Sequence, residues 1–160
     1  MERRNTIFPV LHFAHGFSSA AFASSTFFVG QAGLMQMIWG RFLAMRFFNV
    51  CGVGGYLGAG APVSASNHLG GLAGLYKTPA IYVEASAVFT NTAPIGPYRG
   101  AGRPEATYCV ERLIDTAARE MGIDRAEIRR RNLIPPSAMP FKTGLTFTYD
   151  CGDFPANMEQ

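Results

Sequence analysis

The clearest pattern in the sequence is an apolar stripe at helical spacing between Pro104 and Met121. Small or apolar residues recur every three or four positions, at Ala106, Cys109, Val110, Leu113, Ile114, Ala117, Ala118 and Met121. This period is typical of a helix that buries one face. Pro104 suits the first turn, Glu105 suits the positive end of the helix, and Gly122 suits the terminating position. The stripe therefore predicts a helix over 104–121, with Cys109 as a buried structural thiol.

Two other segments have the pattern of strands. Residues Phe42 to Val50, FLAMRFFNV, are mostly apolar, and the run from Ile81 to Thr90 has an alternating, strand-like pattern. In the second segment Ile81, Val83, Ala85 and Ala87 oppose Tyr82, Glu84 and Ser86. A period of two predicts a strand with one buried face. Residues Ser64 to Tyr76 are small and apolar, which predicts a short helix or coil.

A second, shorter helix is predicted after the long one. Asp124 and Glu127 have the spacing of a capping box, so a helix begins there and continues to about Asn132. Pro135 and Pro136 prevent its continuation. Residues Phe141 to Cys151 have an extended pattern. The predicted fold class is α+β, with a few-stranded sheet packed against one long and one short helix.

The first forty residues differ from the rest of the chain. No Asp, Glu, Lys or Arg occurs from Asn5 to Gly40. We interpret residues 1–40 as a poorly specified segment, non-native or read out of frame, and residues 41–160 as the organised domain. A signal peptide cleaved before Ser24 is an alternative, although His12 and His15 interrupt its apolar region. No apolar run reaches the roughly 18 residues of a membrane span, so none is predicted.

Composition and charge narrow the class of protein further. A chain of 160 residues, with 48% hydrophobic and 16% charged residues, suits one globular domain with a substantial core. The net charge of +3 comes largely from the short helix that carries Arg125, Arg129, Arg130 and Arg131. This cluster predicts a solvated face, or a face paired to a partner's acidic groups, and no nucleic-acid binding. Three cysteines without metal or disulfide spacing favour a reducing compartment and hence the cytoplasm.

Two glycine-rich segments are candidates for ligand binding. Residues Gly52 to Gly60 lack the spacing of a dinucleotide loop, and we expect their glycines to permit a close approach of backbones instead. The second segment, Phe89 to Ala106, joins the predicted strand to the long helix. Arg99 or Arg103 could there donate hydrogen bonds to phosphate, oxo or carboxylate oxygens beside a helix N-terminus. A loop arginine paired with a neighbouring acid is the alternative.

Several motifs, taken in order, carry a resemblance to a known family. They are Gly74-Leu75-Tyr76, PAIYVE from Pro79, FTNT from Phe89, PYRGAGRPEA from Pro97, ERLIDTAAREMGIDRAEIRRRNLIPP from Glu111 and TYDCGDF from Thr148. From about Phe42 to Asp153 the chain resembles the molybdopterin-binding large subunit of the xanthine dehydrogenase, aldehyde oxidase and carbon monoxide dehydrogenase family. The fold implied is part of a molybdopterin-binding domain.

The resemblance implies a molybdenum hydroxylase. Such an oxidoreductase hydroxylates an aldehyde, an N-heterocycle or a related small substrate, with water as the oxygen source. The implied cofactor is molybdenum held by molybdopterin, as the cytosine dinucleotide, and the cofactor performs the difficult chemistry. The implied partners are a small subunit with 2Fe-2S clusters and a medium subunit with FAD.

The resemblance also assigns roles within one loop. Arg99 matches the loop arginine beside the molybdenum cofactor, with Tyr98 as its aromatic neighbour. Gly100 stands where carbon monoxide dehydrogenases carry a cysteine, which counts against carbon monoxide oxidation. Ala101 stands where xanthine and aldehyde oxidases carry a phenylalanine, so Ala101 and Gly102 are expected to border a wider substrate pocket.

The chain also departs from the family pattern. The family's large subunit is several times longer, and its catalytic glutamate and other cofactor loops have no counterpart here. No residue of this chain is therefore predicted to be catalytic or to ligate a metal. We expect this polypeptide alone not to turn over. A truncated, non-catalytic remnant or interaction module is the alternative to a functional part of an enzyme.

Overall fold

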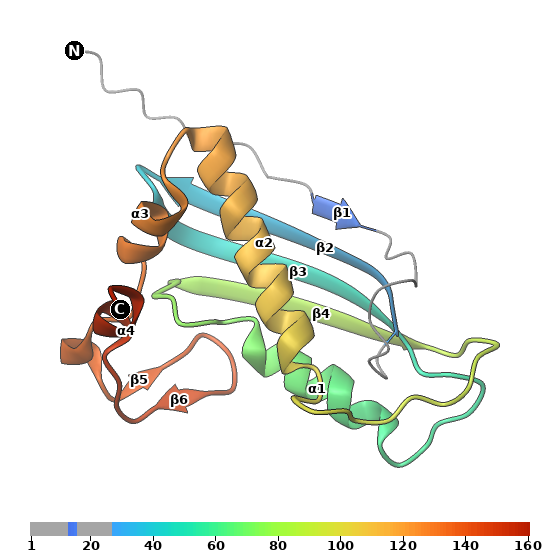
Figure 1. Cartoon of the computed structure of the whole chain (residues 1–160). Helices are drawn as coiled ribbons and strands as arrows, with labels where there is room; N and C mark the ends of the chain where they lie inside the picture. The colour runs from blue at the N-terminus through green and yellow to red at the C-terminus, as the bar shows by residue number, and fades with distance from the viewer. Residues whose placement is uncertain (1–12, 16–26) are drawn as a thin grey trace.

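The computed structural model describes residues 13–15 and 27–160 and has mixed α and β structure. Its elements, in chain order, are β1 (Phe13–His15), β2 (Phe27–Ile38), β3 (Arg41–Gly52), α1 (Ala61–Gly71), β4 (Ala80–Val88), α2 (Arg103–Met121), α3 (Arg125–Arg130), the 3-10 turn η1 (Pro136–Ala138), β5 (Phe141–Lys142), β6 (Thr148–Tyr149) and α4 (Phe154–Met158). The main sheet has the order β1-β2-β3-β4, and β5 pairs with β6 separately (Figure 1). The α+β class is confirmed.

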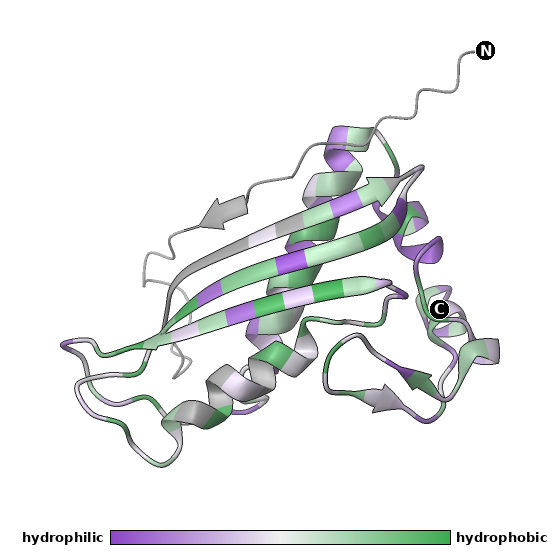
Figure 2. Cartoon of the chain, turned by 180° about the vertical axis from the view of Figure 1, so that it is seen from behind, coloured by the Kyte–Doolittle hydropathy of each residue, from purple (hydrophilic) through white to green (hydrophobic). Residues whose placement is uncertain are grey.

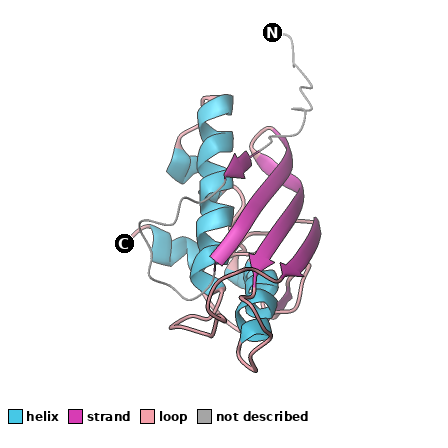
Figure 3. Cartoon of the chain, turned by 90° about the vertical axis from the view of Figure 1, so that its right-hand side faces the viewer, coloured by secondary structure: helices cyan, strands magenta, loops and turns pink. Residues whose placement is uncertain are grey.

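The long helix α2 forms the core with one face of the sheet. Seven residues of the predicted stripe are buried, and Met121 packs against them partly buried. They meet Met35, Met45 and Phe47 from β2 and β3. Burying each large apolar side chain contributes roughly 1.5–3 kcal/mol. Gly122 ends the helix in the left-handed conformation, as its position predicts. Within the described residues the helices lie on one side of the sheet (Figures 2 and 3).

The strand β2 lies inside the segment that the sequence separates as residues 1–40. It pairs antiparallel with β3 along its length, from Phe27 opposite Gly52 to Ile38 opposite Arg41. Trp39 and Gly40 form the turn, both at positive φ, which suits a two-residue hairpin. The boundary at residue 41 therefore does not coincide with an edge of the fold. The sequence pattern does not predict β2, because no charged residue distinguishes a polar face of the strand from a buried one. The proposed foreign origin of residues 1–40 stays a prediction.

The predicted strands after residue 41 are present, with one difference in burial. The segment Phe42 to Val50 lies within β3, and the alternating segment forms β4. Ile81 and Val83 pack against the core, but Ala85 and Ala87 are exposed, so the predicted buried face covers only half of β4. The reason is that β4 is the edge strand of the described sheet, and only its first half contacts the core cluster.

A parallel crossover brings two loops to the same edge of the sheet. β3 and β4 are parallel and paired from Ala44 opposite Ala80 to Gly52 opposite Val88. The helix α1 connects them, so the predicted helix or coil over 64–76 is a helix that begins at Ala61 and ends at Gly71. Because carboxyl ends of parallel strands meet at one edge, the loop after β3 and the loop after β4 lie together there.

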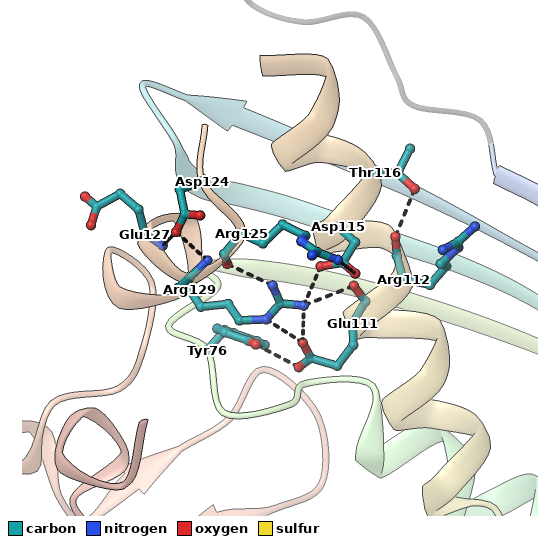
Figure 4. A network of polar contacts seen from close by, with 10 residues as sticks. Tyr76, Glu111, Arg112, Asp115, Thr116, Asp124, Arg125, Glu127 and Arg129 are labelled. Atoms are coloured by element: carbon teal, nitrogen blue, oxygen red, sulfur yellow. Dashed lines mark hydrogen bonds and ion pairs between the residues drawn. The ribbon is translucent and has the colours of Figure 1, made fainter. Parts of the chain in front are cut away.

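The short helix α3 is held to α2 by a network of polar contacts (Figure 4). Arg129 Nε donates to Glu111 Oε2 at 2.8 Å, and Arg129 Nη2 donates to Asp115 Oδ1 at 2.8 Å. Tyr76 completes the network by donating to Glu111 Oε1 at 2.7 Å. The prediction of a solvated or partner-facing arginine cluster is therefore wrong for Arg129, whose acids come from this chain. Arg130 likewise pairs with Glu159.

The ends of α3 follow the sequence signals only in part. Asp124 caps the helix as predicted, accepting hydrogen bonds from the backbone N–H groups of Ala126 and Glu127. The Glu127 carboxylate pairs with Arg131, four residues later. The helix ends at Arg130, before Asn132, whose buried amide donates to Gly40 O and accepts from Phe42 N. Asn132 thus ties α3 to the β2–β3 turn.

Within residues 13–15 and 27–160, no helix combines the length and hydrophobicity that crossing a membrane would require.

Candidate cofactor-binding loop

The five predicted site residues, Tyr98 to Gly102, form a tight loop directly before α2. Ala101 N donates to Tyr98 O at 2.7 Å, and Arg103 N donates to Gly100 O at 3.0 Å. Gly100, Ala101 and Gly102 have φ values of 88°, 45° and 95°. Side chains of L-residues are disfavoured by roughly 1–2 kcal/mol in this region, so glycine at 100 and 102 permits the loop. Ala101 adopts it at a cost.

The loop presents little side-chain bulk because Pro104 packs against Gly100. A Cβ atom at position 100 would lie 2.7 Å from Pro104 Cδ and 2.8 Å from Pro104 Cγ. A side chain at position 100, including a cysteine, would therefore require the first turn of α2 to move. At Gly100 the surface of the loop is therefore formed by backbone atoms.

The two arginines of the loop have different surroundings. The Arg103 guanidinium lies 5.8 Å above the centre of the Phe147 ring and donates weakly to Gly100 O at 3.5 Å. Arg99 is exposed, and within the described part of the chain its side chain makes no hydrogen bond or ion pair. The alternative of an arginine paired with a neighbouring acid is therefore not observed for Arg99. Its neighbour Tyr98 is 65% exposed.

A second glycine-rich loop, Val53 to Gly60, is bonded to the chain that leads into the site. Thr90 N donates to Gly54 O at 3.0 Å, and Gly55 N donates to Thr92 O at 3.0 Å. A Cβ atom on Gly54 would lie 2.5 Å from Pro94 Cα. The predicted close approach of backbones is confirmed for this loop. The sequence pattern alone does not predict that the two loops pair. A signal for this pairing is that both glycine-rich loops follow strands that are parallel neighbours in the sheet.

A small apolar cluster lies beneath both loops, separate from the main core. It contains Val53, Ala61 and Ile95, which are 93% buried or more. Ala61 begins α1, while Ile95 comes from the loop after β4. The cluster fixes the two loops as one unit at the carboxyl ends of β3 and β4.

Asn49 is a buried polar residue near this edge that the sequence does not single out. It is 2% exposed, and neither its amide nitrogen nor its amide oxygen has a hydrogen-bond partner. Its side chain lies on the buried face of β3 with Phe47 and Cys51. An asparagine at the position between Phe47 and Cys51 on the same face of the strand is the only sequence signal for it.

A hollow elsewhere on the sheet does not include the predicted residues. It has a volume of about 350 Å³ and lies near the amino ends of β3 and β4, away from the loop. Its lining comes from Met35, Gln36, Ala44, Met45, Arg46, Ala80, Ile81 and Tyr82. The substrate-pocket role of Ala101 and Gly102 thus stays a prediction.

The chemistry of the loop suits an anionic, oxygen-rich group. Arg99 offers a planar guanidinium with several N–H donors and has no competing acid among the described residues. The loop opens α2, a helix of 19 residues whose dipole places partial positive charge at its start. Bare backbone at Gly100 permits close approach of a bulky ligand. A phosphate-bearing cofactor with oxo ligands fits this donor set.

Comparison with known proteins identifies the class of domain to which this fold belongs. Residues 10–133 match the family of molybdopterin cofactor-binding domains. The chain therefore belongs to this family, which occurs in the large subunits of molybdenum hydroxylases.

Individual relatives agree with this assignment. The chain is 36% identical over 119 residues to the 6-hydroxypseudooxynicotine dehydrogenase complex subunit gamma of Paenarthrobacter nicotinovorans, which covers 71% of this chain and 15% of that protein. It is 40% identical over 83 residues to the carbon monoxide dehydrogenase large chain of Hydrogenophaga pseudoflava, covering 51% of this chain and 10% of that protein.

Solved structures share the fold. CO dehydrogenase from Oligotropha carboxidovorans superposes with a TM-score of 0.73 at 30% identity, over 81% of this chain and 17% of that chain. Quinoline 2-oxidoreductase from Pseudomonas putida 86 gives 0.69 at 37% identity, with the same coverage of 81% and 17%. The chain thus spans less than a fifth of the length of these relatives.

Proposed function

We propose that this chain supplies one wall of the molybdenum cofactor site in a molybdenum hydroxylase large subunit. Arg99, Tyr98 and Gly100 contact the cofactor, while Ala101 and Gly102 border the substrate. The observation that carries the proposal is the exposed Arg99 guanidinium, without a partner among the described residues, in a loop whose next residues have almost no side chains.

Each residue of the loop has a distinct task in this proposal. Arg99 donates charge-assisted hydrogen bonds to cofactor oxygens, and these bonds are roughly twice as strong as neutral ones. Gly100 and Gly102 let the cofactor and substrate approach the backbone. When bound, the cofactor supplies the redox and oxygen-transfer chemistry of hydroxylation. The protein groups hold and orient it.

The substrate class proposed is an aldehyde, an N-heterocycle or a related small molecule. The names of two similar proteins, a nicotine 6-hydroxylase large subunit and a quinoline 2-oxidoreductase, support the heterocyclic choice. Carbon monoxide is disfavoured as the substrate. Carbon monoxide dehydrogenases carry a cysteine where this chain has Gly100, and the Pro104 ring leaves no room for that side chain here.

The further components of the enzyme are also proposals. They are the cytosine dinucleotide form of molybdopterin, a small subunit with 2Fe-2S clusters and a medium subunit with FAD. A relative described as subunit gamma of a complex supports a multi-subunit assembly. The free cysteines Cys51, Cys109 and Cys151 support a cytoplasmic location.

Binding of the cofactor to the purified full-length chain tests the proposal. Equilibrium dialysis with molybdopterin cytosine dinucleotide is expected to show binding that Arg99→Ala weakens about tenfold or more. Arg119→Ala is the matched control, because Arg119 is an exposed arginine in the last turn of α2, at the far end of the helix that the Arg99 loop precedes. Equal affinities of the two variants would contradict the role of Arg99. Absence of binding to the unaltered chain would favour the non-catalytic remnant instead.

A further inference from the structure

We propose that Gly60, in the loop after β3, is a positioning residue for the Arg99 loop and acts through a contact with Pro97. The functional meaning of this inference rests on the proposed role of Arg99. The contact itself is independent of any cofactor. It joins two residues 37 positions apart in the sequence.

The backbone of Gly60 shows that the contact, and not the conformation, requires glycine there. Gly60 has φ −87° and ψ −15°, which any residue adopts readily. A Cβ atom on Gly60 would nevertheless lie 2.7 Å from Pro97 Cδ. Non-bonded carbon atoms prefer separations of about 3.5–4.0 Å. The absent side chain therefore provides the space that the Pro97 ring occupies.

Pro97 is suited to transmit this contact, because it directly precedes Tyr98 and Arg99. Its own φ is fixed by the ring, so a displaced ring carries the backbone of the next residues with it. On the other side of the loop, Pro104 packs against Gly100. The residues from Tyr98 to Gly102 are thus held between two proline contacts, each made possible by a glycine.

The rest of the approach to the loop is already fixed. Gly54 and Gly55 bond to Thr90 and Thr92, and Ile95 belongs to the buried cluster with Val53 and Ala61. The chain is thus fixed as far as Ile95, and only Gly96 separates it from Pro97, so we expect movement of Pro97 to be passed mainly to Tyr98 and Arg99. Among the described residues the loop after β3 makes no hydrogen bond or ion pair with Arg99, yet it sets the position of that arginine through Pro97.

Limited trypsin digestion of the full-length chain tests the positioning role. Trypsin cleaves after Arg99, whereas the bond after Arg103 is protected by Pro104. Gly60→Ala is expected to accelerate cleavage after Arg99 about fivefold, because cleavage requires local opening. Gly96→Ala is the matched control: Gly96 neighbours Pro97, and a Cβ there would meet nothing within 4 Å. Its cleavage rate is expected to stay within about twofold of the unaltered chain.

Cleavage after Lys142, in β5, serves as the internal reference for general loosening of the structure. In a Pro97→Ala background, Gly60→Ala is expected to change cleavage after Arg99 less than about twofold, because the smaller side chain removes the clash. Equal acceleration after Lys142 and Arg99, an unaltered rate in Gly60→Ala, or an undiminished effect in the Pro97→Ala background would each overturn the proposal.

Should Gly60→Ala fail to fold, recovery of folded protein by Pro97→Ala supports the contact, and lack of recovery overturns it. Digestion needs no cofactor, so its outcome does not depend on the proposed function. A Gly60→Ala chain with accelerated cleavage but unchanged cofactor binding would remove the proposed role of Arg99 and leave the positioning contact intact.

Discussion

Pro104 Cδ lies where a Cβ atom on Gly100 would come within 2.7 Å, so the first turn of α2 determines which residue the loop accepts. The same glycine has φ 88°, which disfavours a side chain independently of the clash. The two causes can be separated by mutation.

Gly100→Ala is expected to lower the free energy of unfolding by about 2–3 kcal/mol, from backbone strain and overpacking together. In a Pro104→Ala background only the strain, about 1 kcal/mol, is expected to remain. Gly122→Ala reports strain alone, because Gly122 has φ 64° with nothing within 4 Å of its Cβ position. Urea denaturation of the unaltered chain, Gly100→Ala, Pro104→Ala and the double variant measures the contributions of strain and of overpacking. An unchanged cost of Gly100→Ala without Pro104 would contradict the contact.

Ala101→Gly is expected to stabilise the chain by about 0.5–1 kcal/mol, because Ala101 has φ 45° and glycine relieves the strain there. Ala117→Gly, in the buried interior of α2, is expected to destabilise by about 1 kcal/mol instead. Thermal unfolding followed by circular dichroism distinguishes the two signs. Destabilisation by Ala101→Gly would show that the methyl group contributes packing that outweighs the strain.

Arg129→Ala is expected to cost about 2–3 kcal/mol, because it leaves the carboxylates of Glu111 and Asp115 without their shared partner. The Arg129 side chain is 19% exposed. Arg125, 74% exposed and 3.7 Å from Asp115, is the control, and Arg125→Ala is expected to cost less than about 0.5 kcal/mol. Similar losses in the two variants, measured by denaturant unfolding, would argue against the network.

The pKa of Arg129 fits this picture. Partial burial alone would lower it, but hydrogen bonds to Asp115 and Glu111 raise it overall. Burial, followed by the charge of Glu111, raises the pKa of Tyr76. Both groups therefore keep their protons throughout the physiological range, and the network is expected to persist there.

The stability of the chain is expected to fall above about pH 9. Burial raises the pKa of the Cys51 thiol to about 11 and that of Cys109 to about 12, from an ordinary value of 9.0. Above pH 9 the folded state holds more protons than the unfolded state. The stability that the two protonated thiols contribute is therefore fully present below pH 9 and is lost as the pH rises toward their pKa values in the folded state. Each thiol contributes a slope of at most about 1.4 kcal/mol per pH unit. Urea titrations at several pH values check this, and a flat profile up to pH 11 would contradict it.

Sequence pattern predicts those elements whose two faces differ chemically. The stripe on α2 and the Asp124 cap are read correctly because apolar spacing and capping are local properties. The strand β2 is not predicted, because its sequence carries no charged residues to mark an outer face. Half of β4 is exposed because the strand lies at the edge of the sheet, and a local sequence pattern does not show which strand lies at the edge.

The candidate site shows the same limit. The loop Tyr98 to Gly102 is found through a family resemblance, and its glycines point to it independently. The pairing of Arg129 with Glu111 and Asp115 depends on how α3 lies against α2, so sequence spacing assigns these residues to helix surfaces. Likewise, the contact of Gly60 with Pro97 becomes visible only once the two loops lie together.

Molybdenum content is the most direct measure of the central claim, that the Arg99 loop contributes to a molybdenum cofactor site. The full-length chain and its Arg99→Ala and Arg119→Ala variants would be purified from a host that makes the cofactor, and their molybdenum and pterin quantified. We expect the unaltered chain and Arg119→Ala to retain both components and Arg99→Ala to lose most of them. Equal content in all three proteins, or none in any, would contradict the account.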